Sequence, residues 1–299
     1  MPPLVSIVMR TKDRPVFVRR ALRSIGSQTH ADWELIIVDD GGAPGVVDAV
    51  VAESSPLVRE RTRIISHPVS LGRWQAANAG VRAARGDLLV LHDDDDSWAP
   101  EFLARAAAYL HEHPERLGVV SRIEIVWEQR TGDELRELGR EAFLPESVAP
   151  LLMDQQRFNQ FVPIAFVYRR ELHERLGLYD ESLPVVGDWV FNTRVLELGA
   201  LEYLDSAPLV YWHQRPSGIG VDGNSVIAAS EDHRRTDALL RDEEFRRLVA
   251  REGAGAALYF ERRLRETEEL MKREFASLRK EALHPLRSAY RRLRNRFQK

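Results

Sequence analysis

Four consecutive aspartates, Asp93 to Asp96, are the densest group of chemically active side chains in this 299-residue sequence. Two more polar clusters, residues 10–13 (Arg-Thr-Lys-Asp) and residues 39–42 (Asp-Asp-Gly-Gly), also come directly after apolar runs. Together the three clusters carry seven carboxylates, which would repel one another at one site unless positive charge lay among them. A hard divalent cation held by carboxylate oxygens would supply that charge.

Short β-branched runs alternate with helical patterns over the first ninety residues. The strand-like runs are residues 4–9, 34–38, 63–66 and 87–91, and the helical patterns begin near Pro15, Val46 and Arg73. Strands at this cadence, separated by helices, predict a mostly parallel sheet with right-handed crossovers. In such a sheet ligands collect at the carboxyl ends of the strands, which is where the three polar clusters lie.

The pattern after Pro100 is less regular. A helix at residues 101–111, an alternating strand at 118–127, a helix at 188–198 and a strand at 209–212 are expected in that order. From Ala256 the sequence is helical and highly charged, and Pro285 is expected to kink or end that helix.

The ordered set of motifs resembles a known family. The segments VSIVMRTKDRP, ALRSIGSQTHADWELIIVDDGG and NAGVRAARGDLLVLHDDDDSWAPEFL resemble the nucleotide-sugar domain of family 2 glycosyltransferases of the GT-A fold, closely over residues 4–110 and loosely over 111–215. The resemblance implies an α/β, Rossmann-like, mostly parallel sheet flanked by helices. We expect residues 1–110 to form a donor-binding half, 111–252 the acceptor-binding half of the same domain, and 253–299 a basic helical extension.

The resemblance implies roles for the aspartate run. Aligning the family's Asp-x-Asp motif on Pro100 makes Asp95 a direct ligand of Mn²⁺ or Mg²⁺, with Asp93 or Asp94 holding the ribose or a bound water. A cation there would neutralise the charge that develops on the leaving diphosphate. The alternative is a solvated acidic loop with helix-capping residues, although four aspartates exceed what capping needs.

The family implies a nucleotide pocket between the first two strands. Asp40 would accept hydrogen bonds from the base or ribose, and Arg10, Thr11, Lys12 and Asp13 would wall the base. The family often has a small hydroxyl residue and an aromatic residue in this loop, whereas this chain has Arg10 and Lys12. A cation can face either base carbonyls or a phosphate, so the resemblance does not identify the nucleobase. The alternatives are a tight Asp-Gly-Gly turn and a solvated basic loop.

Two residues on the helix before the fourth strand are candidates for the donor. Arg73 and Asn78 occupy a stretch from which the family extends a basic residue toward the donor, and a guanidinium suits a diphosphate. An ordinary helix surface is the alternative.

The second half supplies the candidates for catalysis. Asp188, in Gly-Asp-Trp at a helix start, resembles the acidic motif that gives inverting members their general base. A helix cap is the alternative, and Asp180 and Glu181 are alternative bases. His213 resembles a further metal ligand found in some members, although a lone histidine is more often a satisfied or surface residue.

The resulting hypothesis is a glycosyltransferase that moves a sugar from a UDP-, dTDP- or GDP-linked donor to a glycan or lipid-linked acceptor in cell-surface polysaccharide or glycolipid assembly. A nucleotidyltransferase usually has a Gly-rich loop after the first strand, and residues 10–15 contain no glycine. A non-catalytic sugar- or nucleotide-binding module would not need both acidic motifs. We expect no nucleic-acid partner.

Composition bounds the rest. The absence of cysteine excludes thiolate chemistry and cysteine-bound zinc. No secretion signal or spanning run is apparent, so a cytoplasmic protein is expected. Residues 253–299 hold 13 Lys and Arg against 6 Asp and Glu, a charge of +7 in a chain of net charge −3. That segment is expected either to lie on the anionic inner face of the cell membrane or to form a homodimer.

Overall fold

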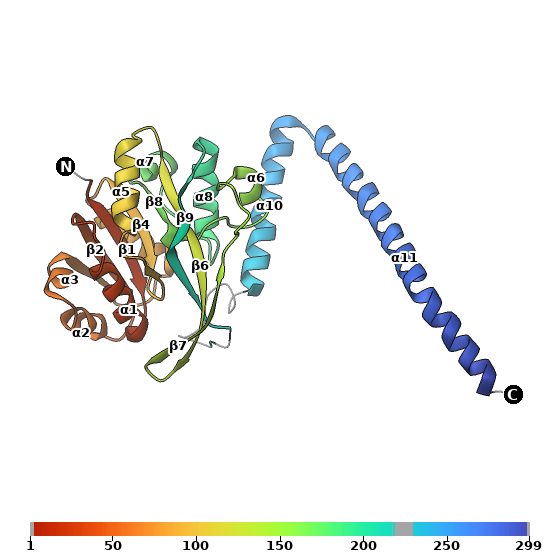
Figure 1. Cartoon of the computed structure of the whole chain (residues 1–299). Coiled ribbons are helices and arrows are strands. Elements are labelled where there is room, and N and C mark those ends of the chain that lie inside the picture. Colours follow the sequence, from red (N-terminus) through yellow and green to blue (C-terminus); the bar gives the residue numbers. More distant parts are fainter. Residues whose placement is uncertain (1–2, 217, 219–229, 298–299) are drawn as a thin grey trace. The chain divides into compact units, whose positions relative to one another are not determined.

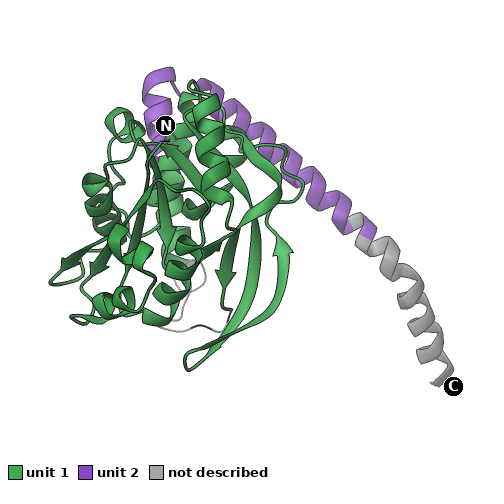
Figure 2. Cartoon of the chain, turned by 60° about the vertical axis from the view of Figure 1, so that its left-hand side comes forward, with its two compact units in different colours: residues 1–237 green, residues 238–299 purple. Residues whose placement is uncertain are grey.

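The computed structural model describes residues 3–216, 218 and 230–297. The chain forms two compact units, residues 1–237 and residues 238–299 (Figure 2). The first unit contains the sheet, all of the candidate site residues and the hydrophobic core. The division of this unit into a donor half and an acceptor half remains a functional prediction.

Four parallel strands form one half of the sheet, as the sequence predicted (Figure 1). They are β1 (Val5–Thr11), β2 (Trp33–Asp40), β3 (Thr62–His67) and β4 (Leu88–Asp93), in the order β3-β2-β1-β4. Every residue of β2 is buried, because helices cover both faces of this half of the sheet and remove the alternation of an exposed strand. The register pairs Thr11 with Asp39 and Arg10 with Asp93, so the polar strand ends meet at one edge.

Helices connect these strands and supply the apolar covering. They are α1 (Pro15–Gly26), α2 (Val46–Ala52), α3 (Pro56–Arg61), α4 (Arg73–Ala83) and α5 (Phe102–Glu112). Pro15 occupies the first turn of α1, where its missing N–H costs nothing, and the predicted apolar face of α1 is buried. Gly80 lets α4 approach β1 closely, since a Cβ there would collide with Val8.

The other half of the sheet is mixed. It contains β5 (Ser97–Trp98), β6 (Gly118–Thr131), β7 (Glu134–Ala142), β8 (Phe166–Arg169) and β9 (Tyr203–Gln214). β8 is antiparallel to both β4 and β6, whereas β9 is parallel to β6. The hairpin partner β7 was not predicted, because its polar, largely exposed sequence shows no buried face. The short helices α6 (Leu152–Gln155) and α7 (Leu172–Leu176) precede α8 (Gly187–Leu198).

The C-terminal part is helical, as predicted. α10 spans Ser230–Glu252 and α11 spans Gly255–Phe297. Pro285 does not end the helix, since α11 continues past it to Phe297. None of the helices within the described ranges combines the length and the apolarity that a bilayer crossing requires.

Candidate active site

The polar clusters meet where the strand order reverses, between β1 and β4. This is the position at which open α/β sheets bind ligands. Arg10 of β1 donates two hydrogen bonds to Oδ1 of Asp93, with its Nη2 at 2.8 Å. Asp94 accepts from Thr11 Oγ1 at 2.6 Å and from Arg14 Nη1 at 2.6 Å. Burial raises the pKa of Asp94 to about 6 against the opposing charge of Arg14.

Asp95 lies between two guanidinium groups. Its Oδ2 accepts from Arg14 Nη2 at 2.7 Å and from Nη2 of the fully buried Arg215. Burial would raise the pKa of Asp95, but the two arginines overcome it and hold that pKa below its usual range. Arg215 also pairs with Glu128 at 2.6 Å, and Arg20 joins Glu128 at 2.5 Å while donating to the backbone oxygen of Asp95.

His213 belongs to the same network. Its Nδ1 lies 3.0 Å from Oε2 of Glu128, and its Nε2 lies 2.8 Å from Oγ of Ser97. Nδ1 also lies 3.1 Å from Nη1 of Arg20, so it faces both a carboxylate, which accepts, and a guanidinium, which donates. The backbone N–H of His213 donates to Asp96, whose pKa burial raises well above its usual range.

Arginines therefore provide the positive charge that the sequence assigned to a cation. Among the described residues, no three or more His, Cys, Asp or Glu side chains gather as a metal site. An ion of the Mg²⁺ type needs only one or two protein carboxylates when a diphosphate supplies the other oxygens, so the oxygen donors present fit such an ion. At Asp95 the ion would compete with Arg14 and Arg215 for Oδ2.

Asp40 uses its carboxylate to hold the loop before α4. Oδ1 accepts from Leu71 N–H at 3.0 Å and lies 2.7 Å from His67 Nδ1, while Oδ2 accepts from Ser70 Oγ at 2.7 Å and Gly72 N–H at 3.0 Å. Burial would raise the pKa of Asp40, but these hydrogen bonds lower it. Asp40 therefore fixes the conformation of the loop before α4.

The loop after β1 is more open. Lys12 and Asp13 are exposed, and Asp13 has a φ of 53°. Its Oδ1 accepts from the backbone N–H of Ala43 at 2.7 Å, which ties this loop to the one after β2. Thr11 is buried and turned toward the aspartate run.

The two candidates on α4 differ. Within the described part of the chain, the guanidinium of Arg73 makes no hydrogen bond or ion pair, and burial together with Arg10 lowers its pKa. Asn78, which was predicted to bind the donor, is held within the fold. Its fully buried amide donates to Tyr179 O at 2.9 Å and Glu181 Oε1 at 2.8 Å, and accepts from Tyr179 N–H, so it fixes the chain before α8.

Asp188 reaches the same site from the second half of the chain. Gly187 allows α8 to lie against the ring of Trp74, because a Cβ there would collide with it. The guanidinium of Arg10 lies over the same Trp74 ring, 4.7 Å from its centroid. Asp188 consequently lies within electrostatic range of Arg10 and Arg73, and burial raises its pKa.

Helix capping does not explain Asp188. Val186 is the N-cap residue of α8, and its side chain makes no capping hydrogen bond. The carboxylate of Asp188 accepts from Asn159 at 2.8 Å and from the backbone N–H of Trp189. The alternative bases are otherwise engaged, since Asp180 binds Ser182 and Glu181 binds Asn78.

Five site residues were not found by sequence reasoning: Arg14, Arg20, Glu128, Asn159 and Arg215. Glu128 had a detectable signal, because it follows Val126 on the inward side of an alternating strand. The partners of the arginines lie 75 to 120 residues away and leave no local pattern.

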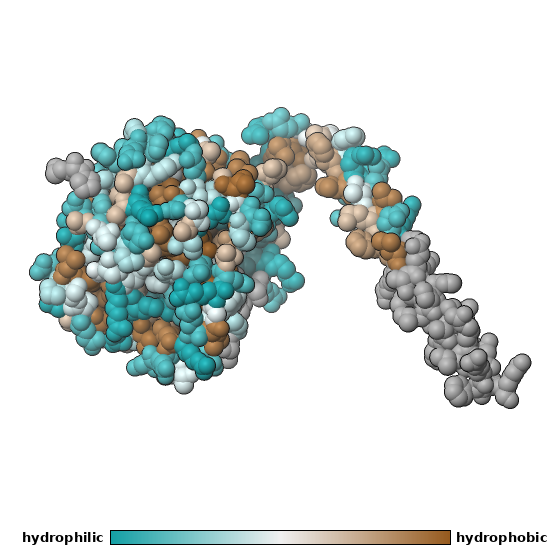
Figure 3. All heavy atoms as spheres, in the orientation of Figure 1, coloured by the Kyte–Doolittle hydropathy of each residue, from teal (hydrophilic) through white to brown (hydrophobic). Residues whose placement is uncertain are grey.

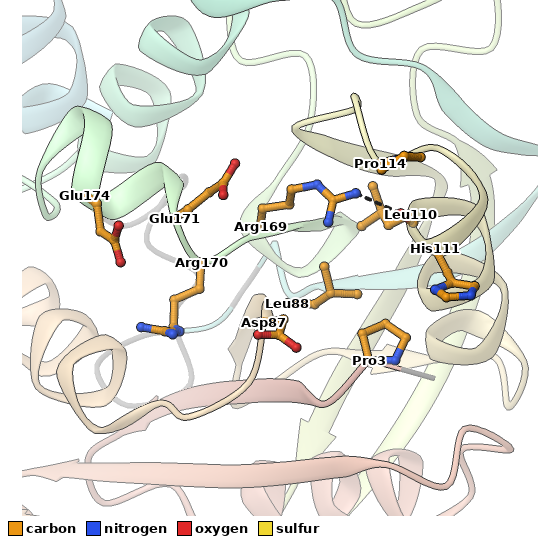
Figure 4. Close-up of a pocket in the computed structure, with 10 residues that line it drawn as sticks. All are labelled: Pro3, Asp87, Leu88, Leu110, His111, Pro114, Arg169, Arg170, Glu171 and Glu174. Atoms are coloured by element: carbon orange, nitrogen blue, oxygen red, sulfur yellow. Dashed lines mark hydrogen bonds between the residues drawn. The ribbon is translucent and has the colours of Figure 1, made fainter. Parts of the chain in front are cut away.

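A separate pocket of about 480 Å³ opens at the opposite end of β4, beside Asp87 and Leu88 (Figure 4). Its Arg169 donates to the carbonyls of Leu110 and His113, which satisfies acceptors at the end of α5. The pocket is therefore distinct from the carboxylate cluster, which follows the other end of the strand.

Sequence comparison gives a consistent assignment. The sequence model of Glycosyl transferase family 2 matches residues 6–177. The uncharacterized glycosyltransferase YwdF of Bacillus subtilis is 29% identical over 208 residues, covering 69% of this chain and 73% of that protein. A PGL/p-HBAD biosynthesis glycosyltransferase of Mycobacterium tuberculosis is 32% identical over 201 residues, covering 67% and 72%.

Solved structures share the fold at low identity. S. aureus TarS 1–349 in complex with UDP-GlcNAc has a TM-score of 0.54 and 19% identity, covering 71% of this chain and 59% of that one. The mannosyltransferase PcManGT from Pyrobaculum calidifontis, in complex with GDP-Man and Mn²⁺, has a TM-score of 0.51 and 20% identity, covering 74% and 59%.

The family match and the fold identify a glycosyltransferase of the GT-A type, which confirms the predicted fold and enzyme class. The chain belongs to glycosyl transferase family 2, whose sequence model covers more than half of it.

Proposed function

We propose that the protein transfers a sugar, with inversion, from a nucleoside diphosphate sugar to an acceptor hydroxyl in polysaccharide or glycolipid assembly. One observation carries the proposal. A partly buried carboxylate, Asp188, faces Arg10 and Arg73 at the carboxyl edge of the sheet. Cations for a diphosphate and a base for an acceptor thus share one site. The relatives named for PGL/p-HBAD biosynthesis support a glycolipid product.

The diphosphate of the donor would lie at Arg73. This guanidinium has no partner among the described residues, and its burial makes an approaching anion favourable. Arg10, Thr11, Lys12 and Asp13 would line the base and ribose, with Asp40 arranging the adjoining loop. The bound UDP-GlcNAc and GDP-Man of the two structural neighbours support a UDP-, dTDP- or GDP-linked donor.

Asp95 would hold a Mn²⁺ or Mg²⁺ ion, with His213 as a further ligand and Asp93 and Asp94 around it. When bound, the ion would neutralise negative charge on the leaving diphosphate. The Mn²⁺ in the PcManGT complex supports this assignment. Nε2 of His213 lies 2.8 Å from Oγ of Ser97, so ligation at Nε2 would replace that hydrogen bond.

Asp188 would act as the general base. Direct displacement at the anomeric carbon requires the acceptor hydroxyl to lose its proton as it attacks. Burial raises the pKa of Asp188, which makes its ionised form a stronger base. Arg10 and Arg73 would keep the carboxylate ionised before the acceptor arrives.

An apolar surface supports a lipid-linked acceptor. The segment next to Asp188 exposes Val148 (82% exposed), Met153 (75%) and Phe158 (45%) to solvent. The same segment binds Asp188 through Asn159. A hydrophobic aglycone could bury this surface while its sugar reaches the base.

We propose further that residues 253–299 dock on the anionic inner face of the cell membrane. Apolar side chains stay exposed along α11, including Leu264, Met271, Phe275 and Leu278 (Figure 3). This apolar stripe, with the charge of +7, is typical of an interfacial helix. The alternative is a homodimer through the same helix.

A donor panel tests the proposed function. Thermal unfolding would be measured with UDP-, GDP-, dTDP- and CDP-sugars and Mn²⁺, for the wild type and Arg73→Ala. One nucleotide class should raise the melting temperature of the wild type, and the rise should shrink in the variant. Arg82→Ala is the matched control, because Arg82 lies on the same helix and is exposed. No shift with any nucleotide sugar would refute the proposal.

A further inference from the structure

A chain of side-chain amides leads to Asp188, and its orientation can be deduced. The backbone N–H of Gln160 lies 2.8 Å from Oε1 of Gln155. A backbone N–H can only donate, so the atom of Gln155 that faces it must be the oxygen. The other end of that amide, Nε2, is therefore the donor that lies 3.0 Å from Oδ1 of Asn159.

A second anchor gives the same orientation. Nδ2 of Asn192 lies 3.4 Å from the backbone oxygen of Phe161, which can only accept. The same Nδ2 lies 3.1 Å from Oδ1 of Asn159. Two donors thus converge on Oδ1, and Gln155 and Asn192 are almost fully buried.

The orientation of Asn159 follows. With Oδ1 accepting from two amides, Nδ2 must face Asp188, and it donates to Oδ2 at 2.8 Å. Donation to an oxygen favours the ionised form of a carboxylate. The backbone N–H of Trp189 also donates to this carboxylate, so two neighbouring groups fix its orientation.

We propose that Asn159 is the positioning residue for the general base, holding Asp188 ionised and fixing the orientation of its carboxylate toward the acceptor hydroxyl. This inference rests on the proposed function, in which Asp188 is the base. The short segment that displays the apolar acceptor surface thereby also sets the orientation of the base.

Several charged or titratable groups surround Asp188. The cations are Arg10 from β1 and Arg73 from α4, and the facing carboxylate is Asp93 from β4. Tyr179 and His233 also lie within electrostatic range. The two arginines lower the pKa of Asp188 and Asp93 raises it. A substitution at Asn159 leaves these three charges in place, so its effect on the pKa of Asp188 can be measured separately.

Two substitutions separate the electrostatic role of Asn159 from a packing role. Asn159→Asp keeps the shape and still accepts from Gln155 and Asn192, but it replaces the donor with a second carboxylate facing Asp188. Asn159→Ala removes both the donor and the acceptor. Loss of one hydrogen bond in Asn159→Ala is expected to raise the pKa of Asp188 by about one unit. The carboxylate introduced by Asn159→Asp should raise the pKa of Asp188 by more, because it adds a like charge.

The test is a ¹³C NMR titration of the full chain labelled at aspartate Cγ, with the Asp188 signal assigned by its absence in Asp188→Asn. The expected pKa of Asp188 increases from the wild type to Asn159→Ala to Asn159→Asp. Where turnover is measured, the acidic limb of the kcat profile should move in the same order with donor affinity unchanged. An Asp188 pKa in Asn159→Asp equal to that of the wild type would overturn the inference.

The kinetics of Asp188→Asn distinguish the two proposals. If this variant is inactive but the pKa order fails, the inference about Asn159 is wrong and the proposed base stands. If the variant keeps full activity, the proposed base is wrong, and the positioning role falls with it even where the pKa order holds.

Discussion

Glu128→Gln tests whether the buried ionic network stabilises the fold at the candidate site. The Glu128 side chain is 3% exposed and contacts Arg20, Arg215 and His213. Burial would raise its pKa, but hydrogen bonds from His213 and Arg20 lower that pKa from 4.5 to about 2. At about 1.4 kcal/mol per pKa unit, the shift corresponds to about 3 kcal/mol of stability.

That stability depends on pH in a defined direction. The pKa of Glu128 is lower in the folded state than the unfolded value of about 4.5, so the contribution is complete above that value. It is lost as the pH falls toward about 2. The difference between wild type and Glu128→Gln should therefore be largest near neutral pH and should decrease below about pH 4.5.

The assay is thermal unfolding followed by circular dichroism. For a unit of this size 1 kcal/mol changes the melting temperature by about 2–4 °C, so Glu128→Gln is expected to lower it by about 6–12 °C. Glu124→Gln is the matched control on the same strand, since Glu124 pairs with Arg140 at the surface and should cost about 0–1 kcal/mol. Equal losses in the two variants would refute the reasoning.

Two further predictions concern the metal and the C-terminal segment. Mn²⁺ binding, followed by electron paramagnetic resonance, should be weak in the free protein, because Arg14 and Arg215 occupy Oδ2 of Asp95, and tighter when the nucleotide is present. Asp95→Ala should abolish the nucleotide-dependent part of the binding. Unchanged Mn²⁺ binding in this variant would contradict the assignment. The full chain should float with anionic liposomes and should detach as the salt concentration rises, whereas residues 1–252 should not float. If neither form binds liposomes and truncation converts a dimer into a monomer, the helix mediates dimerisation instead.

The sequence predicted the fold where local patterns carry the information. The strands β1, β2 and β4 are continuous apolar runs that end in polar clusters, and parallel order brings those ends together. The Gly-Asp-Trp motif singled out Asp188 because it resembles a family motif, but its proximity to Arg10 emerges only in the folded chain. The hairpin strand β7 was missed, since its exposed residues show no apolar periodicity.

Side-chain partnerships could not be predicted from one sequence. Asn78 was expected at the donor, but it bonds to Tyr179, about a hundred residues away, and is fully buried. The positive charge among the aspartates was assigned to a metal, whereas Arg14 and Arg20 supply it from α1 and its N-cap, and Arg215 supplies it from the chain after β9. Such contacts depend on the folded geometry and have no local pattern.

The most direct test of the proposed function is the configuration of the product. Proton NMR of the anomeric signal, with the donor that gives the largest thermal shift, should show inversion relative to the donor. Asp188→Asn should lower kcat by at least about a hundredfold with donor affinity nearly unchanged. A product with retained configuration, or full turnover without the Asp188 carboxylate, would contradict the account.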